Sequence, residues 1–328
     1  MRILMLGTGP FAVPTFEYLL AGAHEVPALV TRPPRSSRGG KAEPAGPMQA
    51  VAEEHGLPVL MPESINSPAG REAIVQWNAE LLVVCDYGQI LSAEALALTP
   101  RGGVNLHGSL LPKYRGAAPV NWAVWNGDAE TGVTVIHMTP RLDGGPILAV
   151  RRTPIGADET TPELEARLSQ LGVDAVREAI DLLAAAPADA VLGERQDPAL
   201  ATKAPRLAKT DGTVDWSRTA RQIFNQVRAL KPWPGTYTHL LREGQPPVRI
   251  ILEQVTVVSE EAVADGVASH KMPGEVVHVD KSSLHVATGA GTLWLDIVQP
   301  AGKRAMPVGE WLRGCAVRVG DRFVLEST

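Results

Sequence analysis

The sequence predicts a two-domain protein in which a doubly wound, mostly parallel α/β sheet is followed by a small antiparallel β-barrel. Short apolar segments alternate with helical segments through the first half of the chain, which is the order of a doubly wound sheet. Several of these segments are continuously apolar, as parallel strands buried on both faces are. After "KPWPG" (231–235), strand-like segments follow one another with turn residues and without helices between them, which indicates a small barrel.

The first domain is expected over residues 1–187. Its predicted strands are the apolar segments at 2–7, 26–31, 57–61, 81–87, 103–108 and 132–138. Helical segments are predicted between them, at 14–21, 47–55 and 71–78. A longer helix is predicted within 158–186, because Thr161 is a suitable N-cap and Pro162 suits the first helical turn.

A polar, proline-containing stretch at 188–209 is interpreted as a linker, and the second domain is expected over 210–328. That domain begins with a short predicted helix at 217–230. Its strands are expected within 247–258, 274–280, 283–300 and 315–325. An oligonucleotide-binding-type (OB-like) barrel is one candidate for this pattern, and the sequence does not separate it from other small barrels.

The composition is that of a globular cytoplasmic protein. Hydrophobic residues make up 45% of the 328 residues, which excludes a disordered chain. The start, "MRILMLGTGP", is typical of a strand and turn rather than of a signal peptide, and no apolar run has the length of a membrane span. Cys85 and Cys315 each lie in an apolar run and are expected to be free thiols. The Cys and His residues form no cluster with metal-ligand spacing, so no metal is expected.

The charge is unevenly divided along the chain. The formal net charge is −5, which argues against a general nucleic-acid coat. Residues 206–328 hold 15 Lys and Arg against 13 Asp and Glu, whereas residues 1–205 hold 16 against 23. The second domain is therefore the less acidic part, a weak indication of a polyanionic partner.

A glycine-rich segment, "GTGPFA" (7–12), follows the first predicted strand and fits the dinucleotide-binding pattern G-x-G-x-x-A. The acidic residue expected at the end of the second strand is missing, because Thr31 and Arg32 stand there. Since an arginine can meet a 2′-phosphate, an NADP-dependent oxidoreductase stays open as an alternative. The other interpretation of the segment is a tight strand-to-helix turn.

The stretch "VNLHGSLLPKYRGAAPVNW" (104–122) begins as a buried strand and ends in polar residues. Asn105 and His107 are two positions apart, so their side chains point to the same face of the strand. A rigid loop containing Gly108 and Pro112 follows them. An amide and an imidazole presented together at a strand end make a catalytic site a hypothesis, beside the alternative of a hydrogen-bonded structural histidine.

The segment "NLHGSLLPKYRGAAP" resembles the signature of the formyltransferases that use 10-formyltetrahydrofolate. The segment "VTVIHMTPRLDGGPIL" resembles the second motif of that family, and the similarity continues through "VVCDYGQIL", "KPWPGTY" and "QPAGKRAM". It thus covers nearly the whole chain and implies a Rossmann-like catalytic domain followed by an OB-like barrel. Two departures fall near the expected folate pocket: Gly9 precedes Pro10 where the family usually has proline, and Asp86 replaces a small apolar residue.

The resemblance implies acyl transfer catalysed by Asn105, His107 and Asp143. Such a reaction needs donors for the oxyanion, an acceptor for the amine proton and a proton for the leaving nitrogen. Asn105 and a protonated His107 would supply the donors. The strand after His107 would return the chain so that Asp143 faces the same cleft, orients the imidazole and favours its charged form.

The resemblance also implies which molecules bind. The residues expected at the 10-formyltetrahydrofolate site are Ser109, Leu110, Leu111 and Pro112, together with Tyr87 and Gly88. The implied acceptor is the methionine amine of initiator methionyl-tRNA in translation initiation, because family members that act on glycinamide ribonucleotide lack a second domain of this kind. The basic residues expected to contact tRNA are Arg38, Lys41, Lys203, Arg206, Lys209, Lys303 and Arg304. Two alternatives stay open: an amino-sugar-nucleotide N-formyltransferase and a non-catalytic RNA-binding module.

Overall fold

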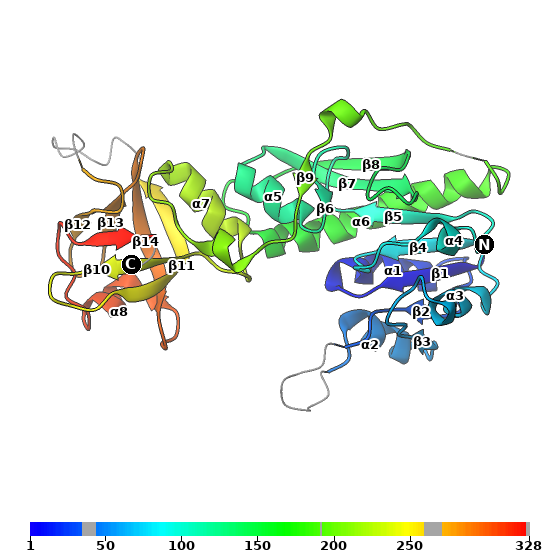
Figure 1. Ribbon diagram of the computed structural model, residues 1–328, viewed down its shortest axis with the longest axis horizontal. Coiled ribbons are helices and arrows are strands. Elements are labelled where there is room, and N and C mark those ends of the chain that lie inside the picture. Colours follow the sequence, from blue (N-terminus) through cyan, green and yellow to red (C-terminus); the bar gives the residue numbers. More distant parts are fainter. Residues whose placement is uncertain (35–43, 191, 259–270, 326–328) are drawn as a thin grey trace. The chain divides into compact units, whose positions relative to one another are not determined.

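In this computed structural model the described residues are 1–34, 44–190, 192–258 and 271–325 (Figure 1). Contacts divide the chain into two compact units. Unit 1 comprises Met1–Val120, Ala129–Ile155 and Glu163–Arg206. Unit 2 comprises Asn121–Asp128, Gly156–Pro162 and Leu207–Thr328. Two short segments from the first half of the chain therefore belong to the second unit.

Unit 1 contains a seven-stranded sheet in the order β3-β2-β1-β4-β5-β7-β8. Its parallel strands are β1 (Ile3–Gly7), β2 (Leu29–Val30), β3 (Val59–Leu60), β4 (Leu81–Cys85) and β5 (Gly103–His107). Two antiparallel strands complete one edge, β7 (Glu130–His137) and β8 (Ile147–Pro154). All residues of β1 and β4 are buried, as the continuous apolar pattern predicted. The doubly wound, mostly parallel fold is confirmed.

Helices lie between the strands of unit 1. They are η1 (Pro10–Ala12), α1 (Val13–Ala21), α2 (Pro47–Glu54), α3 (Pro68–Val75), α4 (Ala93–Leu96) and α6 (Thr161–Ala184). Each of α2 and α3 starts with proline, which lacks the N–H that the first helical turn leaves unpaired. Helix α6 packs against β5, since a Cβ on Gly172 would lie 2.6 Å from the Leu106 side chain. Among the helices in the described ranges, none is both long and apolar enough to cross a membrane.

A two-stranded parallel ribbon joins two distant segments of unit 1. Strand β6 (Arg115–Gly116) pairs with β9 (Lys203–Ala204), which follows the short helix η2 (Pro198–Leu200). The part of the expected linker at 192–206 thus belongs to unit 1 by its contacts and is not free chain. Such short pairings have no hydrophobic periodicity, so the sequence pattern does not indicate them.

Unit 2 is a nearly closed antiparallel barrel with the order β12-β13-β14-β11-β10-β16. An isolated bridge between Glu275 and Arg322 brings the two ends of this sheet together. The core contains Leu252, Leu295 and Phe323, and the residues Ile223 and Val227 of α7 pack on it. The bounds are α5 (Pro119–Asn126, mostly in this unit), η3 (Lys209–Gly212), α7 (Ala220–Ala229), β10 (Tyr237–Leu241), β11 (Val248–Val258), β12 (Val276–Val279), β13 (Leu284–Ala287), β14 (Thr292–Pro300), β15 (Met306–Pro307), α8 (Val308–Leu312) and β16 (Arg322–Val324).

The predicted barrel is confirmed, with differences in its elements. Strand β10 was not expected, although Thr238 and Leu240 alternate with less buried neighbours as in a half-buried strand. The strand expected within 315–325 forms only at Arg322–Val324. Gly320, with a φ of 95°, lies in the turn that delays it.

Candidate active site

Strand β5 ends at the carboxyl edge of the parallel sheet, where ligands of doubly wound folds bind. It lies between β4 and β7, with Cys85 opposite Leu106 and Thr134 opposite His107. Asn105 and His107 share a face of the strand, as their spacing predicted. The Asn105 amide forms no hydrogen bond with a residue in the described part of the chain, so both its donor hydrogens are available to a ligand.

The His107 ring is held from two sides. Its Nε2 atom lies 2.9 Å from the carbonyl oxygen of Tyr114. A carbonyl oxygen only accepts, so Nε2 carries a hydrogen. The Nδ1 atom faces the Asp143 carboxylate, with 3.8 Å to Oδ1, a distance longer than a hydrogen bond. Nδ1 is therefore the ring nitrogen that is free to give or take a proton.

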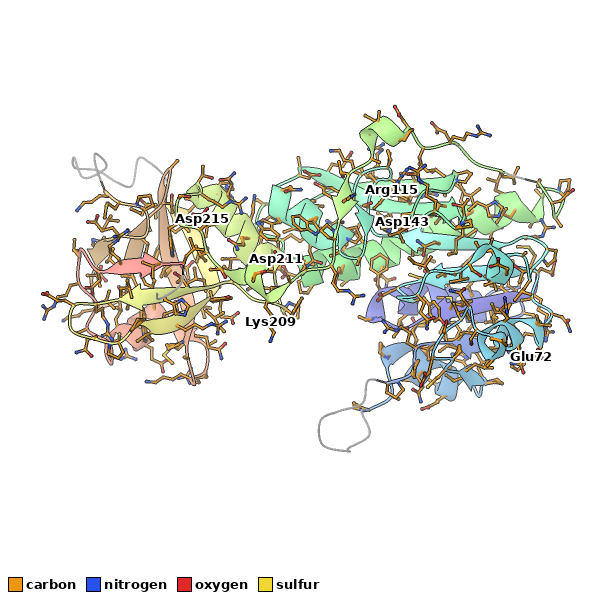
Figure 2. All side chains as sticks on the ribbon, viewed as in Figure 1. Glu72, Arg115, Asp143, Lys209, Asp211 and Asp215 are labelled. Atoms are coloured by element: carbon orange, nitrogen blue, oxygen red, sulfur yellow. The ribbon has the colours of Figure 1, made fainter. Side chains whose placement is uncertain are left out.

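Asp143 lies in the loop between β7 and β8, near Arg115 (Figure 2). Its carboxylate Oδ2 accepts a hydrogen bond of 2.8 Å from the backbone N–H of Gly116. The side chain is only 9% exposed. Asp143 has a φ of 47°, a left-handed conformation that a residue with a Cβ keeps only with support from its neighbours. The structure thus brings Asp143 to His107, as expected from the return of the chain.

The loop 109–112, which is expected to border the folate, is held by several hydrogen bonds. The Ser109 side chain is fully buried, and its hydroxyl donates to the carbonyl oxygen of Lys113 at 2.7 Å. Thr134 Oγ1 donates to the Ser109 carbonyl oxygen and accepts from the Leu111 N–H. Leu111 is 7% exposed, and Leu110 and Pro112 are half-buried. The side chains of Ser109 and Leu111 therefore support the loop, and a ligand there would meet backbone atoms or the neighbouring residues.

The segment after β4 differs from its expected form in one respect. The Tyr87 side chain is 2% exposed and packs in the core, so its ring does not face a ligand site. Burial raises the pKa of its phenol to about 12. Gly88, with a φ of 77°, is exposed, and the Arg32 side chain lies against it. Any folate contact of Tyr87 would therefore use its backbone.

Asp86 explains the altered glycine motif. A Cβ at Gly9 would collide with the Asp86 carboxylate, so the glycine leaves room for this side chain. Asp86 is accessible to solvent, yet desolvation by the surrounding protein raises the pKa of its carboxyl to about 6. Glu165 lies on α6. Desolvation, and secondly the negative charge of Asp86, raise the pKa of Glu165 to about 7.

Five of the predicted tRNA contacts are exposed basic residues. Lys203 is on β9, Arg206 follows it and Lys209 begins η3. Lys303 and Arg304 lie between β14 and β15, and Arg304 forms an ion pair of 2.5 Å with Glu310. The other two, Arg38 and Lys41, lie outside the described residues. Within those residues no group of three or more His, Cys, Asp or Glu side chains is placed to hold a metal ion.

Two protein families match two successive regions of the chain. The family described as "Formyl transferase" matches residues 1–180, and "Formyl transferase, C-terminal domain" matches residues 206–316. The chain belongs to the formyl transferase family. Asn105, His107 and Asp143 all lie in the first match, and the barrel of unit 2 lies largely in the second. As a formyl transferase the protein is an enzyme that moves a one-carbon group.

Curated relatives are similar to this formyl transferase over its full length. A methionyl-tRNA formyltransferase from Rhodopirellula baltica is 46% identical over 99% of this chain and 97% of its own. One from Geobacter sulfurreducens is 40% identical over 98% of this chain and 96% of its own. An N-formyltransferase from Helicobacter canadensis, solved with folinic acid and dTDP-3-aminofucose, has a TM-score of 0.64 at 16% identity, covering 90% of this chain and 98% of its own. That likeness shows the fold alone.

Proposed function

We propose that this formyl transferase moves the formyl group of 10-formyltetrahydrofolate to the α-amino group of methionine on initiator methionyl-tRNA. The observation that carries the proposal is the match to methionyl-tRNA formyltransferases across nearly the entire chain, second domain included. The Asn105 amide, which has no hydrogen-bond partner among the described residues, and the pair of His107 and Asp143 would supply the chemistry such a transfer needs. Because the product initiates translation, we expect the reaction to take place in the cytoplasm.

The transfer forms a bond between the formyl carbon and the amine nitrogen and breaks the bond between that carbon and N10 of the folate. The amine gives up one proton and N10 receives one, so no proton is gained or lost overall. The Asn105 amide would donate to the formyl oxygen as it becomes negative, which is typically worth a factor of about 100 to 1,000 in rate.

His107 and Asp143 would move the proton. Because the Tyr114 carbonyl occupies Nε2, the proton exchanges at Nδ1, on the side of Asp143. The buried carboxylate keeps the ring oriented, and the Gly116 N–H fixes the carboxylate in turn.

We infer that the folate binds at the carboxyl edge of the sheet, between the segment of Gly88 and the loop 109–112. In support, a neighbour of this fold, HypX from Aquifex aeolicus, was solved with tetrahydrofolic acid; it has a TM-score of 0.59 at 17% identity, covering 98% of this chain and 50% of its own. For the tRNA we propose phosphate contacts from Lys203, Arg206 and Lys209, with Lys303 and Arg304 on the barrel. These five side chains are exposed.

Competing acceptors test the proposal. The full-length protein is incubated with 10-formyltetrahydrofolate and, separately, with charged initiator methionyl-tRNA, uncharged initiator tRNA or a dTDP-linked amino sugar. We expect N-formylmethionyl-tRNA in the first reaction and no formylated product in the other two. Formylation of the amino sugar, with methionyl-tRNA left unmodified, would overturn the proposed acceptor while leaving the family assignment intact.

A further inference from the structure

A polar side chain outside both family matches ties the active-site loop together. Gln196 lies in the stretch between residues 180 and 206, which neither comparison covers. Its side-chain nitrogen donates to the carbonyl oxygens of Asp143 and Gly145, both at 2.8 Å. A primary amide has two hydrogens on one nitrogen, so this arrangement uses both.

The other end of the Gln196 side chain is fixed as well. Its carbonyl oxygen accepts two hydrogen bonds from the guanidinium of Arg115, 3.1 Å from Nε and 2.6 Å from Nη2. Arg115 directly precedes Gly116, whose backbone N–H holds the Asp143 carboxylate. Arg115, Gln196, Asp143 and Gly116 therefore form a closed ring in which the loop of Asp143 is held from its backbone and from its side chain.

Tyr114, the residue directly before β6, orients His107. The carbonyl oxygen of Tyr114 accepts a hydrogen bond from the ring Nε2 of His107. The Tyr114 N–H donates to Thr202 Oγ1 at 2.8 Å. Residues 114–116 thus contact both members of the proton-moving pair, and the segment 196–204 holds residues 114–116 through Gln196, Thr202 and the β6–β9 ribbon.

The loop needs such support. Asp143 keeps its left-handed φ of 47° in the middle of the connection, and a Cβ on Gly145 would collide with the carbonyl oxygen of His137. Without the two bonds from Gln196, the carbonyl oxygens of Asp143 and Gly145 would lose their side-chain donors. Relaxation of the loop would move the carboxylate relative to Nδ1 of His107, and a misplacement of about 1 Å can reduce a rate by about 100-fold.

We propose that Gln196 is a positioning residue of the formyl transfer, which acts through the Asp143 loop and contacts neither substrate. The inference rests on the catalytic roles proposed for His107 and Asp143. It makes the segment between the two matched regions part of the catalytic apparatus rather than a tether.

Two variants and a matched control test the role of Gln196. Gln196→Ala removes the whole contact. Gln196→Glu keeps an oxygen for Arg115 but places a carboxylate against two carbonyl oxygens, so we expect it to be at least as harmful. Gln170→Ala is the control, because Gln170 is exposed on α6 and forms no hydrogen bond with a described residue. We expect both Gln196 variants to lower kcat by about 10- to 100-fold with KM for both substrates within about twofold, and Gln170→Ala to match the unmodified enzyme.

A double-variant cycle and a spectrum separate positioning from a general loss of structure. On an Asp143→Asn background, Gln196→Ala should reduce kcat by less than about twofold, because the loop then has no carboxylate to place. The ¹⁵N chemical shifts of the His107 ring should move in Gln196→Ala and Gln196→Glu toward those of Asp143→Asn, and should stay unchanged in Gln170→Ala. A kcat within twofold of the unmodified enzyme in both Gln196 variants, an equal loss on the Asp143→Asn background, or unchanged His107 shifts would each overturn the proposal. If the unmodified enzyme formylates no methionyl-tRNA, the proposed acceptor fails instead, and the ¹⁵N spectra still decide the role of Gln196.

Discussion

At the scale of single residues, we expect the three proposed catalytic side chains to act as one unit. Asn105 and His107 both lie on β5, Asp143 lies in the loop between β7 and β8, and Tyr114 and Asp143 flank the His107 ring. We expect Asn105→Ala, His107→Ala and Asp143→Ala each to lower kcat by about 100-fold or more, and their effects not to add. Single-turnover kinetics would measure the loss, with circular dichroism melting as the check on folding. Near-native turnover in any one folded variant would remove that residue from the mechanism.

Two acids whose pKa values are raised by desolvation, Asp86 and Glu165, make the stability depend on pH. The pKa of Asp86 is about 6 and that of Glu165 is about 7, both raised mainly by desolvation. The folded state therefore holds these protons more tightly than the unfolded chain, so stability falls as pH rises from about 4 and the loss is complete above about 7. We expect Asp86→Asn to raise the melting temperature at pH 8 and to leave it nearly unchanged at pH 4.

The control for this pH effect is Asp189→Asn, which changes an exposed aspartate. We expect the same melting temperature as the unmodified protein at both values of pH. Glu165→Gln should behave like Asp86→Asn, and the double variant should gain less than the sum, because the charge of Asp86 destabilises the charged form of Glu165. An equal shift of Asp86→Asn at pH 4 and pH 8 would mean that packing, not charge, is responsible.

Single residues also mark where sequence reasoning ends. The period of a strand predicted that Asn105 and His107 face the same way, because that relation is local. Asp143 could be proposed from its loop, since an antiparallel strand returns the chain to the same edge. The role of Gln196 could not be predicted from the sequence, because Gln196 lies in a polar stretch without periodicity. It also donates to backbone carbonyl oxygens, which any residue at 143 or 145 would present.

At the scale of elements, the β6–β9 ribbon has no room for a side chain at Gly116. Gly116 has a φ of 131°, and a Cβ there would collide with the carbonyl oxygen of Ala204. Its N–H also holds Asp143. We expect Gly116→Ala to lower both the free energy of unfolding and kcat, because the ribbon must separate to accept the methyl group. Urea unfolding and steady-state kinetics measure the two effects.

Gly244 is the matched control for Gly116. It also has a positive φ, 67°, but no atom lies within 4 Å of the position a Cβ would take. Gly244→Ala should therefore reveal the backbone strain alone, on the order of 1 kcal/mol, with kcat unchanged. If Gly116→Ala were no more harmful than Gly244→Ala, the ribbon would tolerate opening and could not position the catalytic pair.

Elements were predictable in proportion to their apolar periodicity. The buried strands β1, β4 and β5 and the long helix α6 follow it closely. Strand β8 carries Arg151 and Arg152 at the sheet edge, and β10 is a short strand that contains His239. The apolar pattern of each was therefore too weak to predict a strand. The ribbon of β6 and β9 depends on pairing between residues far apart in the chain, which local propensity does not encode.

At the scale of the whole molecule, the two units are not consecutive pieces of chain. Residues 121–128 and 156–162 count with unit 2, where Arg228 donates hydrogen bonds to the carbonyl oxygens of Val124 and Glu159. Two domains were predicted because the alternation of strands and helices gives way to strands alone. The assignment of two short segments of the first half to unit 2 changes neither composition nor periodicity, so the sequence does not indicate it. A chain cut after residue 206 would leave these segments without their partners, so charge variants of the full chain are the better test of tRNA binding.

The exposed bases at the junction of the two matched regions should set the salt dependence of tRNA binding. Within the described part of the chain, Lys203, Arg206 and Lys209 form no ion pairs, so their charges are available to phosphates. Each lost phosphate contact lowers the slope of log binding constant against log salt by about 0.9 for duplex regions, or about 2.7 for all three. We therefore expect the triple alanine variant to bind methionyl-tRNA more weakly and with a shallower slope, and to bind folate as before.

Arg152→Ala with Arg177→Ala is the control, because those charges already pair with Glu130 and Asp174. Filter binding across a salt series decides the question: an unchanged slope in the triple variant would place the phosphate contacts elsewhere.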